Sequence, residues 1–523
     1  MHRNRLFQNE SRRRGAVLRV MCLALMLVVG AVAGLNVALP EIARDTGASQ
    51  TQLQWIVTAY ALAFAALLLP AGAIGDRIGR KPVLAAGLAL FGVSSAAAVF
   101  LNGPGELLAL RGAMGVGAAM IMPVTLSVIT TVFPPEERGK AVGTWVGVAA
   151  GGGVLGLLAS GVLLEWLPWQ AIFVLNAVLA TVALVATLAI VPASRETRPP
   201  RLDLVGTLLS AAALAAVVFG ITEGPERGWG ELTTVVPLAL GLLAGAAFVL
   251  WELRRREPML DPRHFARRGF AAGTLSITVQ FFAAFGFLFL ALPYLQLVLG
   301  YSPLRAAGAL VPMALVVIPL SRKAPAIAAR LGVRVAGAAG LSLMALGFLV
   351  LSLLEVGSSY AHFLAGLLPF GAGMALAGAP ATTAIVASLP RSKQGVASAV
   401  NDVSRELGGA LGIAVLGSLM NGVYRSEMAD SSSGLAADAG ERAQGSLAAA
   451  QQIGEHLGPR GTDFVAQADA AFVHGLTNGL VCGAALLLLG ALFVALRAPG
   501  RVESRSDAGG RAVGAAAAVA ESA

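Results

Sequence analysis

Four ionisable side chains lie inside or at the start of long apolar runs of the sequence, namely Arg111, Asp402, Arg405 and Glu406. Asp402 and Glu406 are four residues apart, so they share one face of a helix, and Arg405 stands between them in the chain. An ionisable group in a membrane helix normally faces protein or a water-filled cavity and takes a partner there. Two interpretations of the three neighbouring residues stay open: a structural ion pair, or a functional polar site.

Arg111 is the most isolated of these charges, shortly after the start of the apolar run 106–132. One interpretation is that its long side chain extends to the nearby membrane surface and keeps the guanidinium in water. The other is that Arg111 is a cation in a substrate cavity. There it would tune the pKa of a nearby acid or meet an anionic group of the substrate.

The turn at 72–82 combines glycines with charged residues and joins two apolar runs, 54–74 and 83–101. A loop this short must lie at a membrane face between two antiparallel helices. Its glycines would allow close helix approach, and its acid could bind neighbouring helix ends. We interpret it as a conformational gate that holds the cytoplasmic side closed in one state; the alternative is a solvated loop. The gate residues are Gly72, Asp76, Arg77, Gly79, Arg80 and Lys81.

The composition predicts the kind of fold that positions these residues. Of the 523 residues, 56% are hydrophobic and 13% are charged, whereas a soluble domain carries about 25% charged residues. A transmembrane helix needs about 20 mostly apolar residues. We therefore predict an all-α polytopic membrane protein with fourteen transmembrane helices, near 17–40, 54–74, 83–101, 106–132, 140–164, 171–191, 204–222, 234–252, 270–293, 305–321, 335–354, 361–388, 398–421 and 474–496.

The basic residues test this count. With the N-terminus in the cytoplasm, 30 of the 38 Lys and Arg residues fall on the cytoplasmic side, six fall outside and two lie within spans. This bias matches the positive-inside rule, so we expect both termini in the cytoplasm and the protein in the cell (inner or plasma) membrane. The net charge of +9 is spread over the loops, which indicates topology and not binding of nucleic acid.

The spans divide the chain. We expect a basic cytoplasmic N-terminus at 1–16, a six-helix bundle at 17–191, two inserted helices at 204–252, a second six-helix bundle at 270–496 and a disordered cytoplasmic tail at 497–523. Within the second bundle, the polar segment 422–473 is expected to be a mobile extracellular loop with room for a short amphipathic helix.

An internal repeat supports two related bundles. Pro134, Gly139, Gly152, Gly153 and Gly156 recur 256 residues later as Pro390, Gly395, Gly408, Gly409 and Gly412. Arg77, Gly79 and Gly87 recur 253 residues later as Arg330, Gly332 and Gly340, with Ala329 in the place of Asp76. Parallel six-helix halves with a substrate site between them are a transporter architecture.

These residues resemble the major facilitator superfamily, and within it the fourteen-helix drug/proton antiporter branch. The segment from Gly72 to Lys81 is similar to the loop signature of the superfamily, and Asn36 to Pro40 is similar to the end of the first helix of that branch. The stretches 294–303 and 395–409 resemble its second half. The resemblance implies a major facilitator fold and a role in antiport for the glycine helix that contains Gly152, Gly156 and Gly161.

Four positions depart from that branch. Ala31 stands where the branch has an aspartate, Met114 where it has a glutamine, Leu157 where it has a proline and Gln170 where it has an arginine. Because the acid of the first span is missing, one hypothesis is that Glu406 replaces it as the proton carrier. Asn36 either lines the cavity or bonds between helices.

The resemblance implies a secondary transporter that exports amphipathic or cationic organic compounds by proton antiport with alternating access. Its expected partners are a small organic substrate, protons and the lipid bilayer, with the chain as a monomer. The alternatives are an exporter or facilitator of an endogenous metabolite with weakened proton coupling, and a binding or regulatory relative that does not transport. The sequence holds no metal-ligand spacing, Walker loop or catalytic constellation, so we expect no cofactor, no metal and no enzyme activity.

Overall fold

The computed structural model describes residues 2–101, 103–195, 203–256, 258–389 and 394–499. Every regular element in these ranges is a helix. The first six are α1 (His2–Thr46), α2 (Gln50–Ile78), α3 (Arg80–Ala98), α4 (Pro104–Val132), α5 (Pro135–Leu164) and α6 (Gln170–Ile190). We call them the N-half.

Local sequence explains where these helices begin and end. Ser49 and Gln52 form a capping box at the start of α2, each side chain accepting a backbone N–H of the other. Gly79 alone separates α2 from α3, with φ +130, a conformation that residues with a side chain rarely adopt. The turn is therefore a single residue, shorter than the predicted 72–82, and Asp76 and Arg80 lie within the helices on either side of it.

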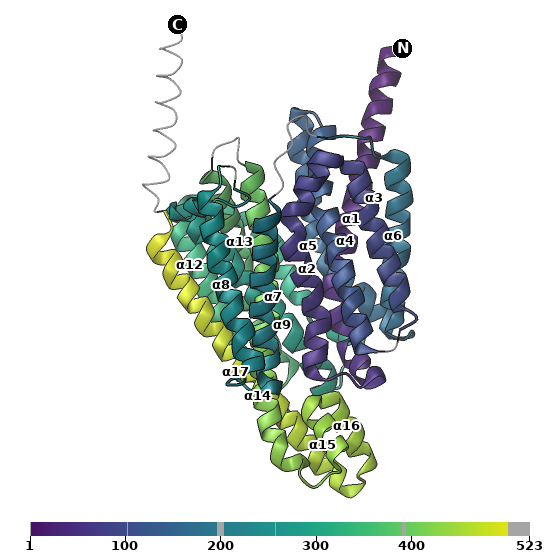
Figure 1. The fold of residues 1–523 in the computed structure, drawn as a ribbon, viewed down its shortest axis with the longest axis vertical. Coiled ribbons are helices and arrows are strands. Elements are labelled where there is room, and N and C mark those ends of the chain that lie inside the picture. Colours follow the sequence, from purple (N-terminus) through teal and green to yellow (C-terminus); the bar gives the residue numbers. More distant parts are fainter. Residues whose placement is uncertain (1, 102, 196–202, 257, 390–393, 500–523) are drawn as a thin grey trace.

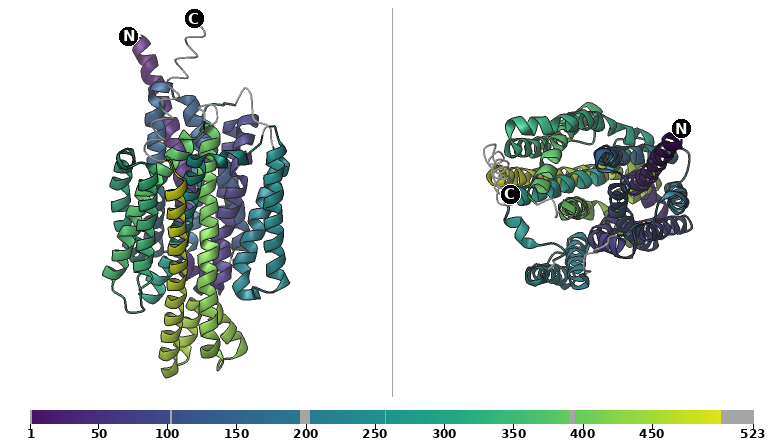
Figure 2. Two further views of the ribbon diagram at one scale, coloured as in Figure 1. Left: turned by 90° about the vertical axis from the view of Figure 1, so that its left-hand side faces the viewer. Right: turned by 90° about the horizontal axis from the view of Figure 1, so that it is seen from above.

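Two further helices, α7 (Leu204–Arg227) and α8 (Leu232–Arg254), follow the N-half. Asp203 caps α7 by accepting the N–H of Gly206 at 2.9 Å. The two helices pack on each other and stand as a pair at the outside of the bundle (Figure 2).

The remaining helices form the C-half. They are the 3-10 turn η1 (Pro262–Ala266), α9 (Arg268–Pro293), the π-turn η2 (Tyr294–Val298), α10 (Pro303–Ala309), α11 (Val311–Leu331), α12 (Val333–Leu351), α13 (Tyr360–Ala387), α14 (Gln394–Ser432) and α17 (Pro459–Arg497). The predicted span 305–321 is broken at Leu310, between α10 and α11, and α11 then continues through Pro319.

The two halves repeat one pattern of helix packing. In the N-half α1 packs on α5, α2 and α3 on α4, and α3 on α6. In the C-half α9 packs on α14, α11 and α12 on α13, and α12 on α17. Each contact of the first set has its counterpart in the second, as the internal sequence repeat predicts.

Thirteen described helices are long and apolar enough to cross a membrane. The fourteenth predicted span corresponds to α5, a 30-residue helix whose apolar part is Gly151–Leu164. An all-helical multi-pass membrane protein with two halves and two inserted helices is thus confirmed as the fold class.

The segment 422–473 contains more helix than the one short helix for which the sequence prediction left room. The ends of α14 and α17 extend into it, and α15 (Ala437–Gly445) and α16 (Leu447–His456) lie between them. We call these four parts the cap (Figure 1). The segment looked like a loop because it is polar, but its alanines favour helix, and Leu447, Ala448 and Ala450 give α16 a buried face.

The start of α1 and the end of α17 lie at the end of the bundle opposite the cap (Figure 1). We call these two ends of the molecule the terminal side and the cap side. Most of the expected tail, residues 500–523, lies outside the described residues, as does the link 196–202.

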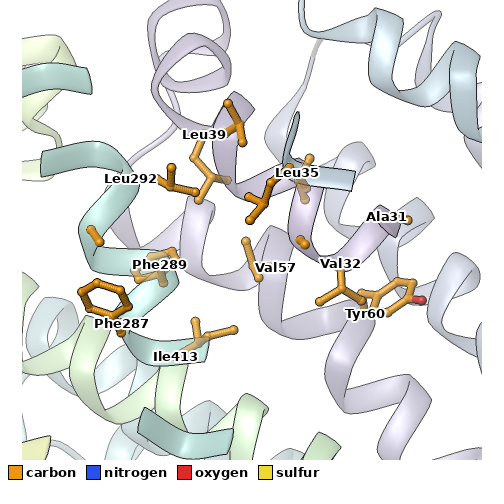
Figure 3. Packing of buried hydrophobic residues seen from close by; sticks show 14 of the residues in the cluster. Ala31, Val32, Leu35, Leu39, Val57, Tyr60, Phe287, Phe289, Leu292 and Ile413 are labelled. Carbon is orange, nitrogen blue, oxygen red and sulfur yellow. The ribbon is translucent and has the colours of Figure 1, made fainter. Parts of the chain in front are cut away.

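The two halves meet in a seam that is apolar toward the cap side. Leu35 and Leu39 of α1 approach Phe289 and Leu292 of α9, and all four side chains are buried (Figure 3). The seam also contains a buried amide, Gln54 of α2, whose Nε2 donates to the carbonyl oxygens of Ile413 (3.1 Å) and Ala414 (2.8 Å) in α14. The halves are therefore joined directly on the cap side.

Candidate functional site

Arg111 lies within protein, 1% exposed, and not at the membrane surface. Its Nε donates to the carbonyl oxygen of Ile56 at 3.2 Å, and its guanidinium carbon lies 4.3 Å from the ring centroid of Tyr60. The Tyr60 hydroxyl donates to the carbonyl oxygen of Val28 at 3.2 Å, which fixes the ring. Arg111 Nη2 is buried without a hydrogen-bond partner. This geometry excludes the surface interpretation and leaves a buried cation with bonding capacity to spare.

The acidic pair lies on α14, about a third of the way along that helix from the terminal side. Glu406 Oε2 is buried without a hydrogen-bond partner, and the Arg405 guanidinium stacks on the Phe281 ring, 5.1 Å from its centroid. Asp402 and Arg405 both act electrostatically on Glu406. Arg405 nevertheless forms no ion pair within 4.0 Å among the described residues, so the structural ion pair is not the arrangement found.

Arg111 and Glu406 belong to different halves, on α4 and α14, and α2 packs on both of these helices. Tyr60 of α2 lies under the Arg111 guanidinium. Each of the two predicted charged positions therefore lies on a helix that contacts α2. Neither Tyr60 nor Gln54 was singled out from the sequence. The available signal was polarity inside an apolar run, since a hydroxyl or amide buried in a membrane helix requires a partner.

Asn36 is 1% exposed in α1 and donates through Nδ2 to the carbonyl oxygen of Val32 at 2.9 Å. Its Oδ1 is buried without a partner, so it makes no side-chain bond to another helix through that atom. Ala31, five residues earlier, is also buried. An acid at this position would have lain inside the N-half, close to the Tyr60 ring (Figure 3).

The gate residues form a network inside the N-half. Asp76 Oδ1 accepts from Arg80 through Nε (3.2 Å) and Nη2 (3.0 Å), and the Ser127 hydroxyl of α4 approaches it at 3.5 Å. Arg80 also donates to the Thr131 hydroxyl of α4. The hydrogen-bond partners of Asp76 among the described residues, Arg80 of α3 and Ser127 of α4, both lie in the N-half.

The rest of the turn is anchored to α6 and to the segment that follows it. The N–H of Arg80 donates to the carbonyl oxygen of Ser194 at 2.9 Å, and Lys81 Nζ donates to that of Leu188 at 2.8 Å. Arg77 is exposed. Gly72 approaches Pro123 of α4, whereas a Cβ on Gly75 would meet the Val124 side chain at 2.9 Å. Close packing of α2 on α4 therefore depends on these glycines.

The second copy of the turn has the same backbone but not the same charges. Gly332 separates α11 from α12 with φ +93, as Gly79 separates α2 from α3. Ala329 is exposed and stands in the place of Asp76. The acid-centred network is therefore present in the N-half alone.

The glycine helix makes close contacts of two kinds. A Cβ on Gly156 would lie 2.5 Å from the Cα and carbonyl oxygen of Gly30, and Gly152 approaches Val29, so both pack α5 on α1. Gly161 instead faces the C-half, where a Cβ would lie 3.0 Å from Leu304 and Ala307 of α10. Gly412 in α14 stands against Phe282 of α9 as Gly156 stands against Gly30, which fits the repeat.

No group of three or more potential metal ligands occurs among the described residues. Two six-helix halves in parallel repeat, with two inserted helices, define a membrane transport protein of the two-bundle class. Comparison with known proteins gives the family.

The family model of the Major Facilitator Superfamily matches residues 21–413. The chain is 34% identical to the puromycin resistance protein pur8 of Streptomyces alboniger, over 97% of this chain and 95% of that relative. It is 33% identical to the multidrug efflux pump LfrA of Mycolicibacterium smegmatis, over 92% of this chain and 96% of that relative. A solved structure, the inward-facing, unoccupied form of a bacterial homologue of the human lysosomal transporter Spinster, superposes with a TM-score of 0.65 at 18% identity, covering 93% of this chain and 97% of that one. The chain belongs to the Major Facilitator Superfamily, and it is a transport protein, not an enzyme.

Proposed function

We propose that the protein exports amphipathic or cationic organic compounds, antibiotics among them, by alternating access in exchange for protons. The observation that carries this proposal is that each half contains a buried charged side chain with an unsatisfied polar atom. Arg111 and Glu406 come from opposite halves, and each keeps a buried polar atom without a partner. Such atoms are costly unless a ligand, a proton or water satisfies them in part of the cycle.

The relatives support the direction and the kind of cargo. One is named for resistance to puromycin and the other as a multidrug efflux pump, and the chain covers each almost from end to end. Resistance by export requires movement out of the cell, so the terminal side would face the cytoplasm and the cap would face outward in the plasma membrane. The bias of basic residues toward the terminal side supports the same orientation.

Glu406 is the proposed proton carrier. The first span has Ala31 where an acid would be expected, and Glu406 lies on a helix of the seam with one oxygen unbonded. Protonation would remove a buried charge, and release of the proton would restore an anion that attracts a cationic substrate. Arg405 and Asp402 would set the balance between the two forms. We propose that a monomer is sufficient for transport, because Arg111 and Glu406 both belong to one chain.

Expression in a host that lacks its own efflux pumps tests the proposal. Cells would be challenged with a panel of cationic and neutral antibiotics, puromycin included, with and without a protonophore. We expect lower accumulation of at least one compound, and loss of that difference when the proton gradient collapses. Efflux that survives the protonophore would favour a facilitator of a metabolite with weak proton coupling. Binding of a compound without flux in proteoliposomes would favour a non-transporting relative.

A further inference from the structure

The inserted helix α7 is bonded to both halves near the cap side. In α2, the Trp55 Nε1–H donates to Glu223 Oε1 of α7 at 2.7 Å. In α14, the Ser418 hydroxyl donates to the carbonyl oxygen of Ile221 of α7 at 2.7 Å. Glu223 is 8% exposed, and α7 packs on both α2 and α14. The helix thus touches the two elements whose separation would open the cap side.

The bond from Ser418 has a structural cause. Four residues after Ile221 comes Pro225, which has no N–H to give to the Ile221 carbonyl oxygen. The Ser418 hydroxyl supplies the donor that the helix lacks. A carbonyl left without a donor in an apolar surrounding is costly, so the contact between α7 and α14 resists separation.

The bond from Trp55 is easier to break than the bond from Ser418, because Glu223 has a second partner. Arg227, one turn later in α7, lies 2.6 Å from Glu223 Oε2 through Nε. The carboxylate therefore stays paired if Trp55 withdraws. A tryptophan that is partly exposed near a membrane surface is also well solvated there, since its ring is amphipathic.

Gln54, the neighbour of Trp55, connects the contacts of α7 with the direct contact between α2 and α14. Gln54 donates to the carbonyl oxygens of Ile413 and Ala414 and reaches the Ser418 hydroxyl at 3.4 Å. Residues 54 and 55 of α2 thus engage α14 and α7 at the same level. Any separation of α2 from α14 on the cap side must also break one of the two bonds that α7 makes.

We propose that α7 is a part of the cap-side gate: it moves with α14, to which Ser418 fixes it, and grips α2 through the bond between Trp55 and Glu223 only while the cap side is closed. Glu223 is then a positioning residue of the transport cycle, and the inserted pair is more than a linker between halves. This inference rests on the alternating access of the proposed function.

Distances between spin labels test which half α7 follows. The labels would be placed on exposed positions of α1 (Arg44), α7 (Glu226) and α14 (Ser426), after Cys22 and Cys482 are replaced by serine. Pairs of labels would be measured in lipid nanodiscs at acid and alkaline pH. We expect the 44–226 distance to lengthen together with the 44–426 distance, while the 226–426 distance stays constant.

A 226–426 distance that changes while 44–226 stays constant would place α7 with the N-half and overturn the proposal. A 44–426 distance that never changes, at either pH or in any variant, would overturn alternating access itself. These two failures are distinct, because the first leaves the proposed function intact.

Substitutions test the bond between Trp55 and Glu223. Trp55→Phe keeps the ring contact with Phe219, whose centroid is 5.9 Å away, and removes the N–H donor. We expect the ratio of cap-open to cap-closed molecules to rise about tenfold, the loss expected for a bond to a charged acceptor, with little change in melting temperature. Glu223→Ala should reproduce this shift. Glu223→Gln keeps an acceptor for Trp55 and should restore most of the closed population.

Trp166→Phe is the matched control, because Trp166 is 75% exposed and lies between α5 and α6 in the N-half. It should leave the populations unchanged. A Trp55→Phe protein with the populations of the parent would contradict the proposal.

Discussion

The Arg111 guanidinium lies over the Tyr60 ring, with its central carbon 4.3 Å from the ring centroid, and is buried within the N-half. A desolvated cation and an aromatic face attract each other by about 2 kcal/mol. The Tyr60 hydroxyl, fixed on the Val28 carbonyl oxygen, holds the ring in this position. A positive charge is thus held inside the N-half, with Arg111 Nη2 left without a hydrogen-bond partner.

Replacing Arg111 by lysine should impair transport although it keeps the charge. Lysine lacks the planar guanidinium that stacks on Tyr60 while Nε bonds to the Ile56 carbonyl oxygen. We expect a fall of about tenfold in the initial rate of efflux, corresponding to about 1.4 kcal/mol. Tyr60→Phe keeps the aromatic face and loses the bond to Val28 alone, so its effect should be smaller. Equal rates for Arg111→Lys and the parent would remove Arg111 from the site.

Asp76→Asn should slow the conformational exchange. The neutral amide cannot hold Arg80 by the charge-assisted bonds at 3.0 and 3.2 Å. A hydrogen bond to a charged group contributes about 1.5–3 kcal/mol. We expect transport to fall by an order of magnitude or more (~10-fold) while substrate affinity changes little. The measurement is efflux rate against equilibrium binding in the same membranes. Arg77→Gln, an exposed residue of the same turn, should keep at least most of the activity.

Gly156→Ala should destabilise the protein. Its Cβ would lie 2.5 Å from backbone atoms of Gly30, so α1 and α5 must separate. Forced overpacking of this kind costs about 1–3 kcal/mol. The melting temperature of the purified protein in detergent should fall. Gly151→Ala on the same helix is the control, since a Cβ there has no atom within 4 Å and should leave the melting temperature unchanged.

Asp203 should make the start of α7 sensitive to acid. Burial raises the pKa of this carboxyl, but the hydrogen bonds from Gly206 and Trp251 and the charge of Arg255 outweigh it and hold the pKa below its usual value. A carboxylate with a lowered pKa stabilises the fold above its unfolded pKa, and this contribution is lost as the pH falls through the folded pKa. Asp203→Asn should therefore lower the melting temperature at neutral pH. The two proteins should converge in strong acid, and a constant difference at every pH would refute this assignment.

Much of the architecture could be predicted from the sequence, because bilayer thickness sets the length of each span and the basic residues beside it set its orientation. The gate turn and the repeat could be recognised because their glycines recur at a fixed spacing in the sequence. Gly79 and Gly332 are 253 residues apart and adopt the same kind of backbone. Most of the helix in the cap was not predicted, because a short helix such as α16 buries small residues against its neighbours and contains no long apolar run.

The site was predicted only in part, because partners in a seam are set by packing and not by spacing. Arg111 could be named as a charge in an apolar run, but its contacts with Tyr60 and with the Ile56 carbonyl oxygen depend on how α4 lies along α2. The bond between Trp55 and Glu223 is similar: its members are 168 residues apart and belong to segments that the sequence treats as unrelated.

Proton flux through Glu406 is the most direct test of coupled export. The purified protein and its Glu406→Gln variant would be reconstituted in proteoliposomes with a fluorescent pH indicator inside, and a cationic compound that the parent expels from cells would be added. We expect the parent to move protons in the direction opposite to the compound and to concentrate the compound when a pH gradient is imposed. The variant should still exchange labelled for unlabelled compound, but without proton movement or accumulation against a gradient. Proton-coupled accumulation by Glu406→Gln at the rate of the parent would contradict the role of Glu406.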